Sequence, residues 1–233
     1  MKRAEYIEKT RQLYSLVAVL SNKNGCKVLR LRNKITGKDL VLRSFPAPVT
    51  AYEKLQNIRC ACLPEIYDVL EVDDGQIVLE EYIDGITIAQ VMETGRYRHK
   101  GARKVLFGVC DALAVLHSRG IIHRDVKPEN VMIESSGRIV LIDLNASRME
   151  SSASKDTVIM GTVGYASPEQ LGISQTDART DIYAVGVLYN VMLTGQHPSV
   201  TIAPGKAGHI IRKCTAVNPD ERYQSAAKLR LAL

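Results

Sequence analysis

The sequence predicts an α+β chain of two unequal lobes, a small β-rich N-terminal lobe and a larger, mostly helical C-terminal lobe. In the N-terminal third, short apolar runs alternate with polar residues and Gly-containing turns, which is typical of strands. After Asp84-Gly85 the apolar residues recur at helical spacing. With 233 residues, 45% of them hydrophobic, the chain is long enough for one or two cores. We therefore expect lobes at 1–83 and 84–233.

The N-terminal lobe is expected to hold several strands and one short helix. Asp73-Asp74-Gly75 has the composition of a hairpin turn between two of these strands. A helix is expected within residues 49–58, because Tyr52, Leu55 and Ile58 fall on one helical face. The strands are predicted at 28–31, 40–42, 67–72 and 77–81.

The C-terminal lobe is expected to be built on helices. Apolar residues recur at helical spacing from Val105 to Leu116, and Gly120 provides a typical C-terminal cap. Residues 180–193 predict a second, mostly buried helix, and further helices follow from Lys206. The chain stops at Leu233 within an apparent helix, which suggests a fragment of a longer protein.

Composition excludes several classes of function. The net charge is +6, but Trp is absent, only two Phe occur and no nucleic-acid-binding motif is visible, so no nucleic-acid partner is expected. No signal peptide opens the chain, and no apolar run is long enough to span a membrane. The five cysteines form no metal-binding pattern and are expected to be reduced thiols. We expect a cytoplasmic protein, or the cytoplasmic part of a larger or membrane-anchored one.

Four motifs occur in a fixed order along the chain. They are His123-Arg124-Asp125-Val126-Lys127-Pro128-Glu129-Asn130, Ile139 to Asn145, Gly161 to Gln170 and Asn218 to Tyr223. Together they resemble the bacterial, eukaryotic-like serine/threonine protein kinases over nearly the whole chain. The first matches the catalytic loop H-R-D-x-K-P-E-N, and the third is similar to the G-T-x-G-Y-x-x-P-E-Q end of the activation segment. A shared order is more specific than any one short match.

The resemblance implies the two-lobed protein kinase fold and transfer of the γ-phosphoryl group of ATP to a Ser or Thr of a protein substrate. Asp125 would be the catalytic residue that orients the hydroxyl and accepts its proton, and Lys127 would offset charge at the γ-phosphate. Asn130 and Asp143 would hold Mg²⁺, or Mn²⁺, on the ATP phosphates. The family's D-F-G is Asp-Leu-Asn here, and we expect Asn145 to tolerate the positive φ of the replaced glycine.

Three further residues are expected to be structural. The resemblance implies that Glu169 pairs with Arg222 and that Asp181 holds the backbone of the catalytic loop. Thr162 would hydrogen-bond near Asp125 and Lys127. The hydroxyl-rich stretch 149–157 is either an activation loop, phosphorylated at Thr157 and read by Arg124, or a flexible polar loop.

The N-terminal lobe departs from the family pattern in its phosphate clamp. Aligning Val28 with the family's Val after the glycine loop places Arg43 where the family has a lysine that binds the ATP phosphates. Arg43 would bind the phosphates and pair with Glu53 on the short helix. The family's three loop glycines fall on Ser21, Lys23 and Cys26.

The adenine side of the clamp is expected at the end of the last N-terminal strand. Glu81 and Tyr82 begin the hinge, whose backbone would bind the adenine edge. Glu80 falls at the gatekeeper position behind the adenine, which is usually apolar in the family, so a carboxylate is unusual there.

Three functions remain open from the sequence. The first is an active serine/threonine protein kinase with an adapted clamp, favoured because Asp125, Lys127, Asn130 and Asp143 are all present. The second is a pseudokinase that binds nucleotide weakly and signals by conformation. The third, a small-molecule phosphotransferase of the kinase-like superfamily, ranks last because those enzymes lack the activation-segment motif. Lys23 could replace the clamp lysine, whereas Lys27 faces the wrong side of its strand if Val28 faces the nucleotide.

Overall fold

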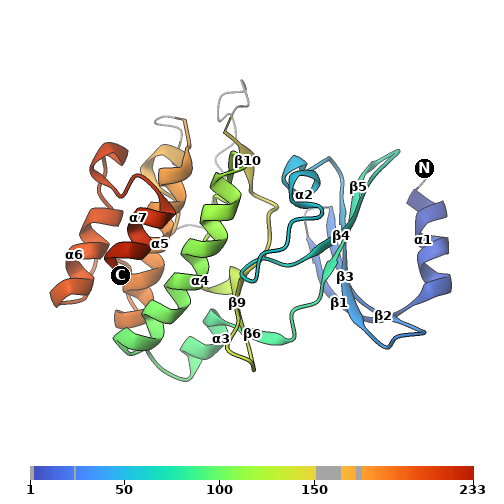
Figure 1. Cartoon of the computed structure of the whole chain (residues 1–233), viewed down its shortest axis with the longest axis horizontal. Coiled ribbons are helices and arrows are strands. Elements are labelled where there is room, and N and C mark those ends of the chain that lie inside the picture. Colours follow the sequence, from blue (N-terminus) through green and yellow to red (C-terminus); the bar gives the residue numbers. More distant parts are fainter. Residues whose placement is uncertain (1–2, 24, 151–163, 172–174) are drawn as a thin grey trace. The chain divides into compact units, whose positions relative to one another are not determined.

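The computed structural model describes residues 3–23, 25–150, 164–171 and 175–233 (Figure 1). The chain divides into two compact units. Unit 1 comprises Met1–Cys60 and Pro64–Ile83, and unit 2 comprises Ala61–Leu63 and Asp84–Leu233. Ala61–Leu63 lie between the two segments of unit 1 along the chain but belong to unit 2. We did not predict this exchange from the sequence.

Unit 1 is built on a five-stranded antiparallel sheet in the order β1-β2-β3-β5-β4. The four predicted strands are confirmed, and the predicted hairpin turn lies between β4 and β5. A fifth strand, β1, runs through most of the segment aligned with the family's glycine loop. The strands are β1 (Tyr14–Lys23), β2 (Cys26–Asn33), β3 (Asp39–Phe45), β4 (Ile66–Val72) and β5 (Gly75–Glu81).

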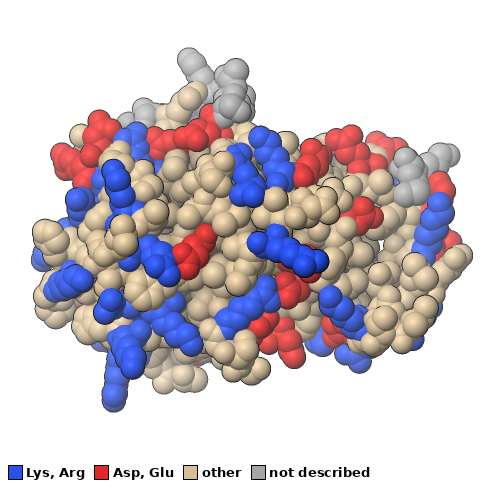
Figure 2. Space-filling view, in the orientation of Figure 1, with Lys and Arg blue, Asp and Glu red and all other residues tan. Residues whose placement is uncertain are grey.

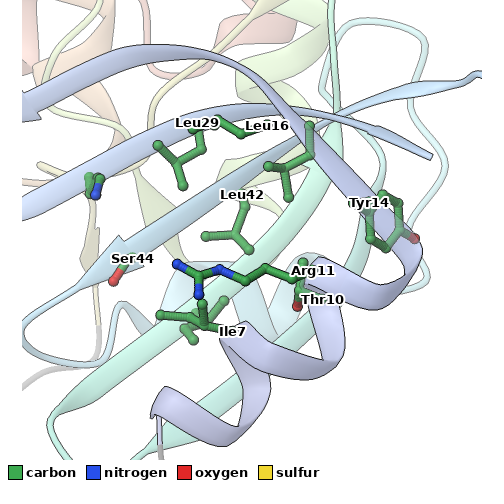
Figure 3. A pocket seen from close by; sticks show the side chains of 11 residues that line it. Ile7, Thr10, Arg11, Tyr14, Leu16, Leu29, Leu42 and Ser44 are labelled. Atoms are coloured by element: carbon green, nitrogen blue, oxygen red, sulfur yellow. The ribbon is translucent and has the colours of Figure 1, made fainter. Parts of the chain in front are cut away.

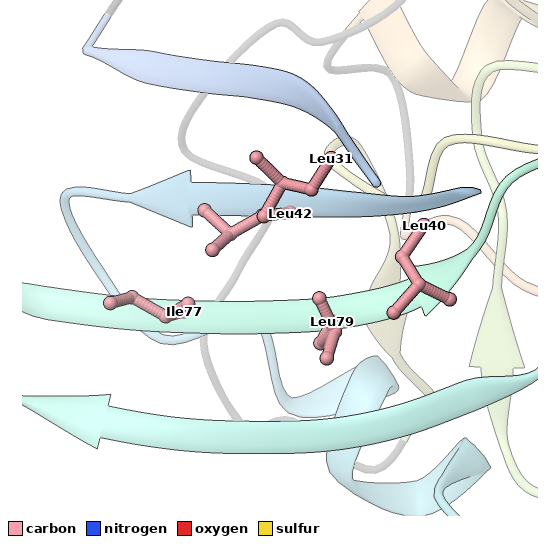
Figure 4. Close-up of a cluster of buried hydrophobic side chains, with 5 residues drawn as sticks. All are labelled: Leu31, Leu40, Leu42, Ile77 and Leu79. Atoms are coloured by element: carbon pink, nitrogen blue, oxygen red, sulfur yellow. The ribbon is translucent and has the colours of Figure 1, made fainter. Parts of the chain in front are cut away.

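One face of this sheet is covered by an N-terminal helix, α1 (Arg3–Leu13), which we did not predict. Its sequence carries few apolar residues, so it has no clear hydrophobic stripe. The guanidinium of Arg3 anchors it, donating to the carbonyl of Phe45 at 2.9 Å and to the carboxylate of Asp74 at 2.5 Å. Apolar residues on the covered face form a buried cluster (Figure 4), comprising Leu31, Leu40, Leu42, Ile77 and Leu79.

A cavity of about 230 Å³ lies between α1 and the sheet. Figure 3 shows Arg11 of α1 extending across it toward Ser44 of β3. Lys27 and Leu29 of β2 line it as well, so it opens on the sheet face opposite to Val28. The expectation that Lys27 faces away from Val28 is therefore confirmed, and this cavity does not belong to the predicted nucleotide clamp.

Helix α2 (Thr50–Leu55) is shorter than the helix predicted within 49–58. Gln56 has extended backbone angles and Asn57 has a φ of +66°, which ends the helix before Ile58. Tyr52 of α2 is buried against Phe45 of β3, with ring centroids 5.5 Å apart. This aromatic contact attaches the short helix to the sheet.

Unit 2 is mainly helical and carries two small sheets (Figure 1). Its helices are α3 (Ile88–Glu93), α4 (His99–His117), α5 (Ala178–Thr194), α6 (Gly205–Cys214) and α7 (Ala226–Ala232). Its strands are β6 (Gly85–Thr87), β7 (Ile121–Ile122), β8 (Val131–Glu134), β9 (Ile139–Leu141) and β10 (Arg148–Met149), ordered β6-β8-β9 and β10-β7. Short 3₁₀ turns are η1 (Pro128–Asn130), η2 (Pro168–Leu171) and η3 (Pro219–Glu221).

The two long helices follow the predicted patterns. Most apolar residues of α4 between Val105 and Leu116 are buried, and the helix ends at His117, ahead of Gly120 with its φ of +67°. Helix α5 is buried on most of its surface, begins at the capping carboxylate of Asp177 and ends at left-handed Gly195. Together these two helices form much of the packed core of unit 2, which supports the loops that carry the predicted catalytic motifs.

The start of α4 carries an exposed basic stretch that includes Arg98, Lys100 and Lys104. Figure 2 shows Lys and Arg side chains over much of the visible surface, denser where α6 and the beginning of α4 lie. Within the described part of the chain, no helix is long and apolar enough to cross a bilayer.

Candidate active site

The loop between β7 and η1 brings the predicted catalytic side chains into contact. Nζ of Lys127 lies 2.8 Å from Oδ2 of Asp125. The side-chain amide of Asn130 donates to the same oxygen and to the backbone carbonyl of Asp125, both at 2.8 Å. The 3₁₀ turn η1 starts at Pro128, whose fixed φ suits the first position of a helical turn. A cation and an amide thus hold the Asp125 carboxylate in one orientation.

A buried carboxylate on α5 fixes the backbone of this loop. Asp181 accepts the N–H of His123 at 2.9 Å and the N–H of Arg124 at 2.8 Å, and Nε2 of His117 lies 2.8 Å from its Oδ2. Burial would raise the pKa of Asp181, but the hydrogen bond from His117 and the nearby imidazole charges outweigh it, so the pKa is lowered. The predicted role of Asp181 is confirmed.

Arg124 itself has a left-handed backbone, with a φ of +67°. Such a conformation is strained in a residue with a long side chain. Its N–H is held by Asp181, and its carbonyl accepts the side-chain amide of Gln170 at 2.9 Å. These two contacts keep the turn that presents Asp125. The contribution of Gln170 was missed from the sequence.

Asp143 is placed next to the catalytic loop by its neighbour in the chain. The N–H of Ile142 donates to the carbonyl of Asn130 at 2.8 Å, and Nε2 of His123 lies 3.2 Å from the carbonyl of Ile142. The left-handed residue of this motif is Asp143, with a φ of +70°, and not Asn145 as we expected. Its carboxylate accepts the N–H of Asn145 at 3.3 Å, which explains why an Asp can adopt this backbone.

Asn130 and Asp143 offer the donor atoms that Mg²⁺ or Mn²⁺ prefers. The amide nitrogen of Asn130 bonds to Asp125, so its oxygen is the atom left to ligate a metal. In the part of the chain that the structure describes, no cluster of three His, Cys, Asp or Glu residues could hold an ion without other ligands. Two protein ligands fit a metal that takes its remaining ligands from phosphate and water.

The predicted ion pair between Glu169 and Arg222 is confirmed. The two groups are bidentate, with N···O distances of 2.6 and 3.0 Å, and both side chains are buried. The hydroxyl of Thr180 also donates to Glu169 at 3.0 Å. Burial raises the pKa of Glu169, but the hydrogen bonds and the charge of Arg222 reverse this, and the pKa is lowered. The pair fixes η2, which carries Gln170.

Two predicted residues of the activation segment lie outside the described residues. These are Thr157, the expected phosphorylation site, and Thr162, the expected neighbour of Asp125 and Lys127.

In unit 1, the predicted clamp residues share one face of the sheet. Val28 on β2 is the direct cross-strand partner of Arg43 on β3, so both side chains lie on the same face. Arg43 is opposite Val78 on β5, and Glu80 follows two residues later on that face. Nε of Arg43 lies 2.5 Å from Oε1 of Glu80, and the two side chains are only 8% and 5% exposed.

Arg43 thus pairs with Glu80, and the expected pair with Glu53 does not form. Glu53 accepts a hydrogen bond from the side-chain amide of Gln76 at 3.1 Å, and Gln76 in turn accepts the N–H of Val49 at 3.0 Å. The reason lies in the strand register, which brings Glu80 closer than the short helix brings Glu53. The β3–β5 register could have been used to find this pair from the sequence.

The hinge residues Glu81, at the end of β5, and Tyr82, directly after it, contact other residues of unit 1. Glu81 pairs through its backbone N–H with the carbonyl of Glu65 at 2.9 Å, and its carboxylate accepts the N–H of Glu65 at 3.2 Å. The guanidinium of Arg30 lies over the ring of Tyr82, 4.1 Å from its centroid. Both side chains therefore have partners within unit 1, and the N–H of Glu81 is used within the sheet. Binding of the adenine edge by the backbone of Glu81 and Tyr82 stays a prediction.

Comparison with known proteins supports the same family. The chain matches the family model described as protein kinase domain over residues 25–229. It is 34% identical over 184 residues to serine/threonine-protein kinase PknB of Mycobacterium tuberculosis, which covers 67% of this chain and 29% of that protein. It is 31% identical over 228 residues to the probable serine/threonine-protein kinase CPE1738 of Clostridium perfringens, covering 85% and 32%.

This chain spans about a third or less of the length of these relatives. The family model nevertheless covers most of the chain. The side chains of that family's motifs also form the contacts described above, between Asp125 and Lys127 and between Glu169 and Arg222. The resemblance to bacterial serine/threonine kinases and the α+β kinase fold, both predicted from the sequence, are confirmed, and the chain belongs to the protein kinase domain family.

Proposed function

We propose that this chain is the catalytic domain of an ATP-dependent serine/threonine protein kinase. The observation that carries the proposal is the contact of Asp125 with Lys127 and Asn130, beside the strand end that bears Asp143. Catalysis of phosphoryl transfer consists mainly of positioning and of charge stabilisation, and these side chains supply both.

Asp125 and Lys127 are the catalytic residues of the proposed reaction. The carboxylate of Asp125 orients a Ser or Thr hydroxyl and accepts its proton as the bond from that oxygen to the γ-phosphorus forms. The bond from the γ-phosphorus to the bridging oxygen breaks in the same step, which leaves ADP. Lys127, held 2.8 Å from Asp125, offsets the negative charge on the transferred group.

Asn130 and Asp143 are the proposed metal ligands, for Mg²⁺ or Mn²⁺. The metal, when bound, neutralises charge on the ATP phosphates. The side-chain amide of Asn130 also donates to Asp125, so the proposed metal ligand and the proposed catalytic carboxylate are in direct contact.

We assign the direct contacts with the nucleotide, those not made through the metal, to residues of unit 1. Arg43 would bind the phosphates, Val28 would pack on the adenine, and the backbone of Glu81 and Tyr82 would bind the adenine edge. Residues 1–83 then serve as the nucleotide clamp, and residues 84–233 supply the catalytic loop and the activation segment. We place this domain in the cytoplasm, where ATP and reduced thiols are available, with a protein substrate as its partner.

The test is transfer of radiolabel from ATP to the chain itself, with Mg²⁺ or Mn²⁺ and with casein as an added acceptor. We expect label on the wild type and at least about a hundredfold less on Asp125→Asn, whose amide cannot accept the proton. Asp220→Asn, which changes an exposed carboxylate of the same unit, should behave as wild type. Equal labelling of the wild type and Asp125→Asn would contradict the assignment.

A second candidate is a pseudokinase that binds nucleotide and signals by conformation. The buried pair of Arg43 with Glu80 favours it, because a clamp cation that is already neutralised binds phosphate less strongly. Thermal unfolding with and without Mg-ATP separates the two cases when combined with the labelling assay, because a ligand that binds the native state raises its stability. An ATP-induced shift without any label would favour this candidate.

A small-molecule phosphotransferase ranks third. The Glu169–Arg222 pair belongs to the activation-segment architecture of protein kinases, which speaks for a protein substrate. Activity toward small alcohols or aminoglycosides but not toward proteins would favour it.

A further inference from the structure

The two least expected residues of unit 1 are partners of each other. Arg43 stands where the family has a lysine, and Glu80 stands where the family is usually apolar. The register of β3 and β5 places them diagonally on one face of the sheet, at a spacing that long side chains can bridge. Their 2.5 Å contact joins two side chains that are nearly inaccessible to water. Each departure supplies a buried counter-charge for the other.

The contact constrains the guanidinium in a way that a lysine could not reproduce. Glu80 binds Nε, which belongs to a planar group with five donors in a fixed arrangement. A bond at Nε sets the plane of the whole group and thereby the directions of its other donors. Because β3 and β5 also share backbone hydrogen bonds, this anchor belongs to the sheet itself.

The glutamate of the short helix has a different task. Glu53 accepts the amide of Gln76, a residue of β5 that is completely buried and that also accepts the N–H of Val49 just before α2. Gln76 therefore joins Glu53 and the start of α2 to the sheet. This chain of contacts secures the helix and does not include Arg43.

We propose that Glu80 is the positioning residue for Arg43, so that the sheet, and not the glutamate of α2, orients the cation of the nucleotide clamp. The inference rests on the proposed function, in which Arg43 binds the ATP phosphates. In protein kinases the corresponding lysine pairs with a glutamate of the helix, so that movement of the helix controls the clamp. In this chain that glutamate bonds to Gln76, and the side chain that orients Arg43 belongs to the neighbouring strand of the sheet.

The test compares two glutamates by the same substitution. Initial rates of radiolabel transfer to casein are measured over a range of ATP concentrations for wild type, Glu80→Gln and Glu53→Gln. Glu80→Gln should lower kcat/KM for ATP by at least about tenfold, mostly through KM, because the guanidinium loses its fixed orientation. Glu53→Gln should lower it by less than about threefold, since an amide can still bond to Gln76. KM for casein should stay within about twofold in both.

A second variant separates positioning from folding. Glu80→Gln could unfold the chain by removing a buried counter-charge of Arg43. The double variant Arg43→Met/Glu80→Met removes both charges and fills the site with apolar groups, so it should melt close to the wild-type temperature. It should nevertheless lose the thermal shift that Mg-ATP induces in the wild type, because the clamp cation is gone.

The outcomes are distinct. If Glu53→Gln impairs ATP use as strongly as Glu80→Gln, Arg43 depends on α2 and the inference is wrong, while the proposed function stands. A wild-type KM for ATP in folded Glu80→Gln also overturns it, as does an unchanged ATP-induced shift in the double variant. If the wild type neither transfers label nor shifts with Mg-ATP, the proposed function fails and the inference falls with it.

Discussion

At the scale of single residues, the catalytic loop depends on one buried carboxylate. Asp181 accepts two backbone N–H groups of the loop and contacts His117, so both of its oxygens are used. These bonds hold Arg124 in a left-handed conformation that it would not adopt by itself. Asp181 therefore positions Asp125 without contacting the substrate.

Replacing this carboxylate should disturb both folding and transfer. In Asp181→Asn an NH₂ group faces one of the two backbone N–H donors, so one bond becomes a repulsion. We expect the free energy of unfolding to fall by about 2–4 kcal/mol and label transfer to fall at least about tenfold. Chemical denaturation and the radiolabel assay measure the two effects.

The matched control is Asp177→Asn on the same helix. Asp177 caps α5 by accepting the N–H of Arg179 at 2.7 Å, and Asn caps a helix about as well as Asp. Its stability and activity should stay near those of the wild type. Comparable losses in both variants would contradict a special role for Asp181.

At the scale of elements, the position of β9 depends on a glycine of α4. A Cβ atom added to Gly108 would lie 2.6 Å from Cβ and 2.8 Å from Cγ2 of Ile139, closer than real contacts allow. The helix and the strand thus approach each other with no room for a methyl group. Because β9 ends two residues before Asp143, this contact helps to place the proposed metal ligand.

Gly108→Ala should destabilise unit 2 by about 1–3 kcal/mol through this overpacking, although alanine favours helices. Gly101 on the same helix is the control, because its added Cβ would meet only the ring edge of Tyr97 at 3.2 Å. Gly101→Ala should be neutral or slightly stabilising, owing to its higher helix propensity. Urea denaturation compares them, and equal stability of the two variants would refute the packing argument.

At the scale of the whole chain, two buried carboxylates contribute to the loss of stability in acid. The pKa values of Glu169 and Asp181 are both lowered in the folded protein. A carboxyl group with a folded pKa below its unfolded value stabilises the fold above the unfolded pKa, near 4, and loses this contribution as pH falls through the folded pKa. Stability from these groups is therefore complete at neutral pH.

The melting temperature of the wild type should thus be insensitive to these groups above about pH 5 and should fall increasingly below about pH 4. The double variant Glu169→Gln/Arg222→Met lacks one of the two carboxylates and should lose less stability over the same acid range. Thermal unfolding between pH 3 and pH 7 measures both. Parallel curves for the two proteins would argue against this linkage.

Much of the fold and of the catalytic loop could be predicted from local sequence. Strands β2 to β5 of unit 1 and the helices α4 and α5 could be predicted from the spacing of their apolar residues, many of which are buried. Asp125, Lys127 and Asn130 lie within one short loop, so the chain itself keeps them close. Helix α1 was missed because it carries little apolar signal and is anchored by the polar contacts of Arg3.

Left-handed residues and long-range side-chain partners were harder to predict from the sequence. The left-handed Asp143 depends on a hydrogen bond within its own turn, and the contact of Gln170 with Arg124 joins residues 46 positions apart. The partner of Arg43 was assigned to Glu53 by analogy, whereas the strand register selects Glu80. Such choices depend on which side chains the backbone brings within a few ångströms.

The sequence by itself determined the family, the two kinds of lobe and the candidates for catalytic and metal-binding side chains, because these depend on residue type and on short spacing along the chain. Only the tertiary structure decided that Glu80 is the partner of the buried Arg43 and that Arg124 adopts a left-handed backbone. Both depend on contacts between segments that are distant in the sequence, where a buried charge or a strained backbone persists only if its surroundings satisfy it.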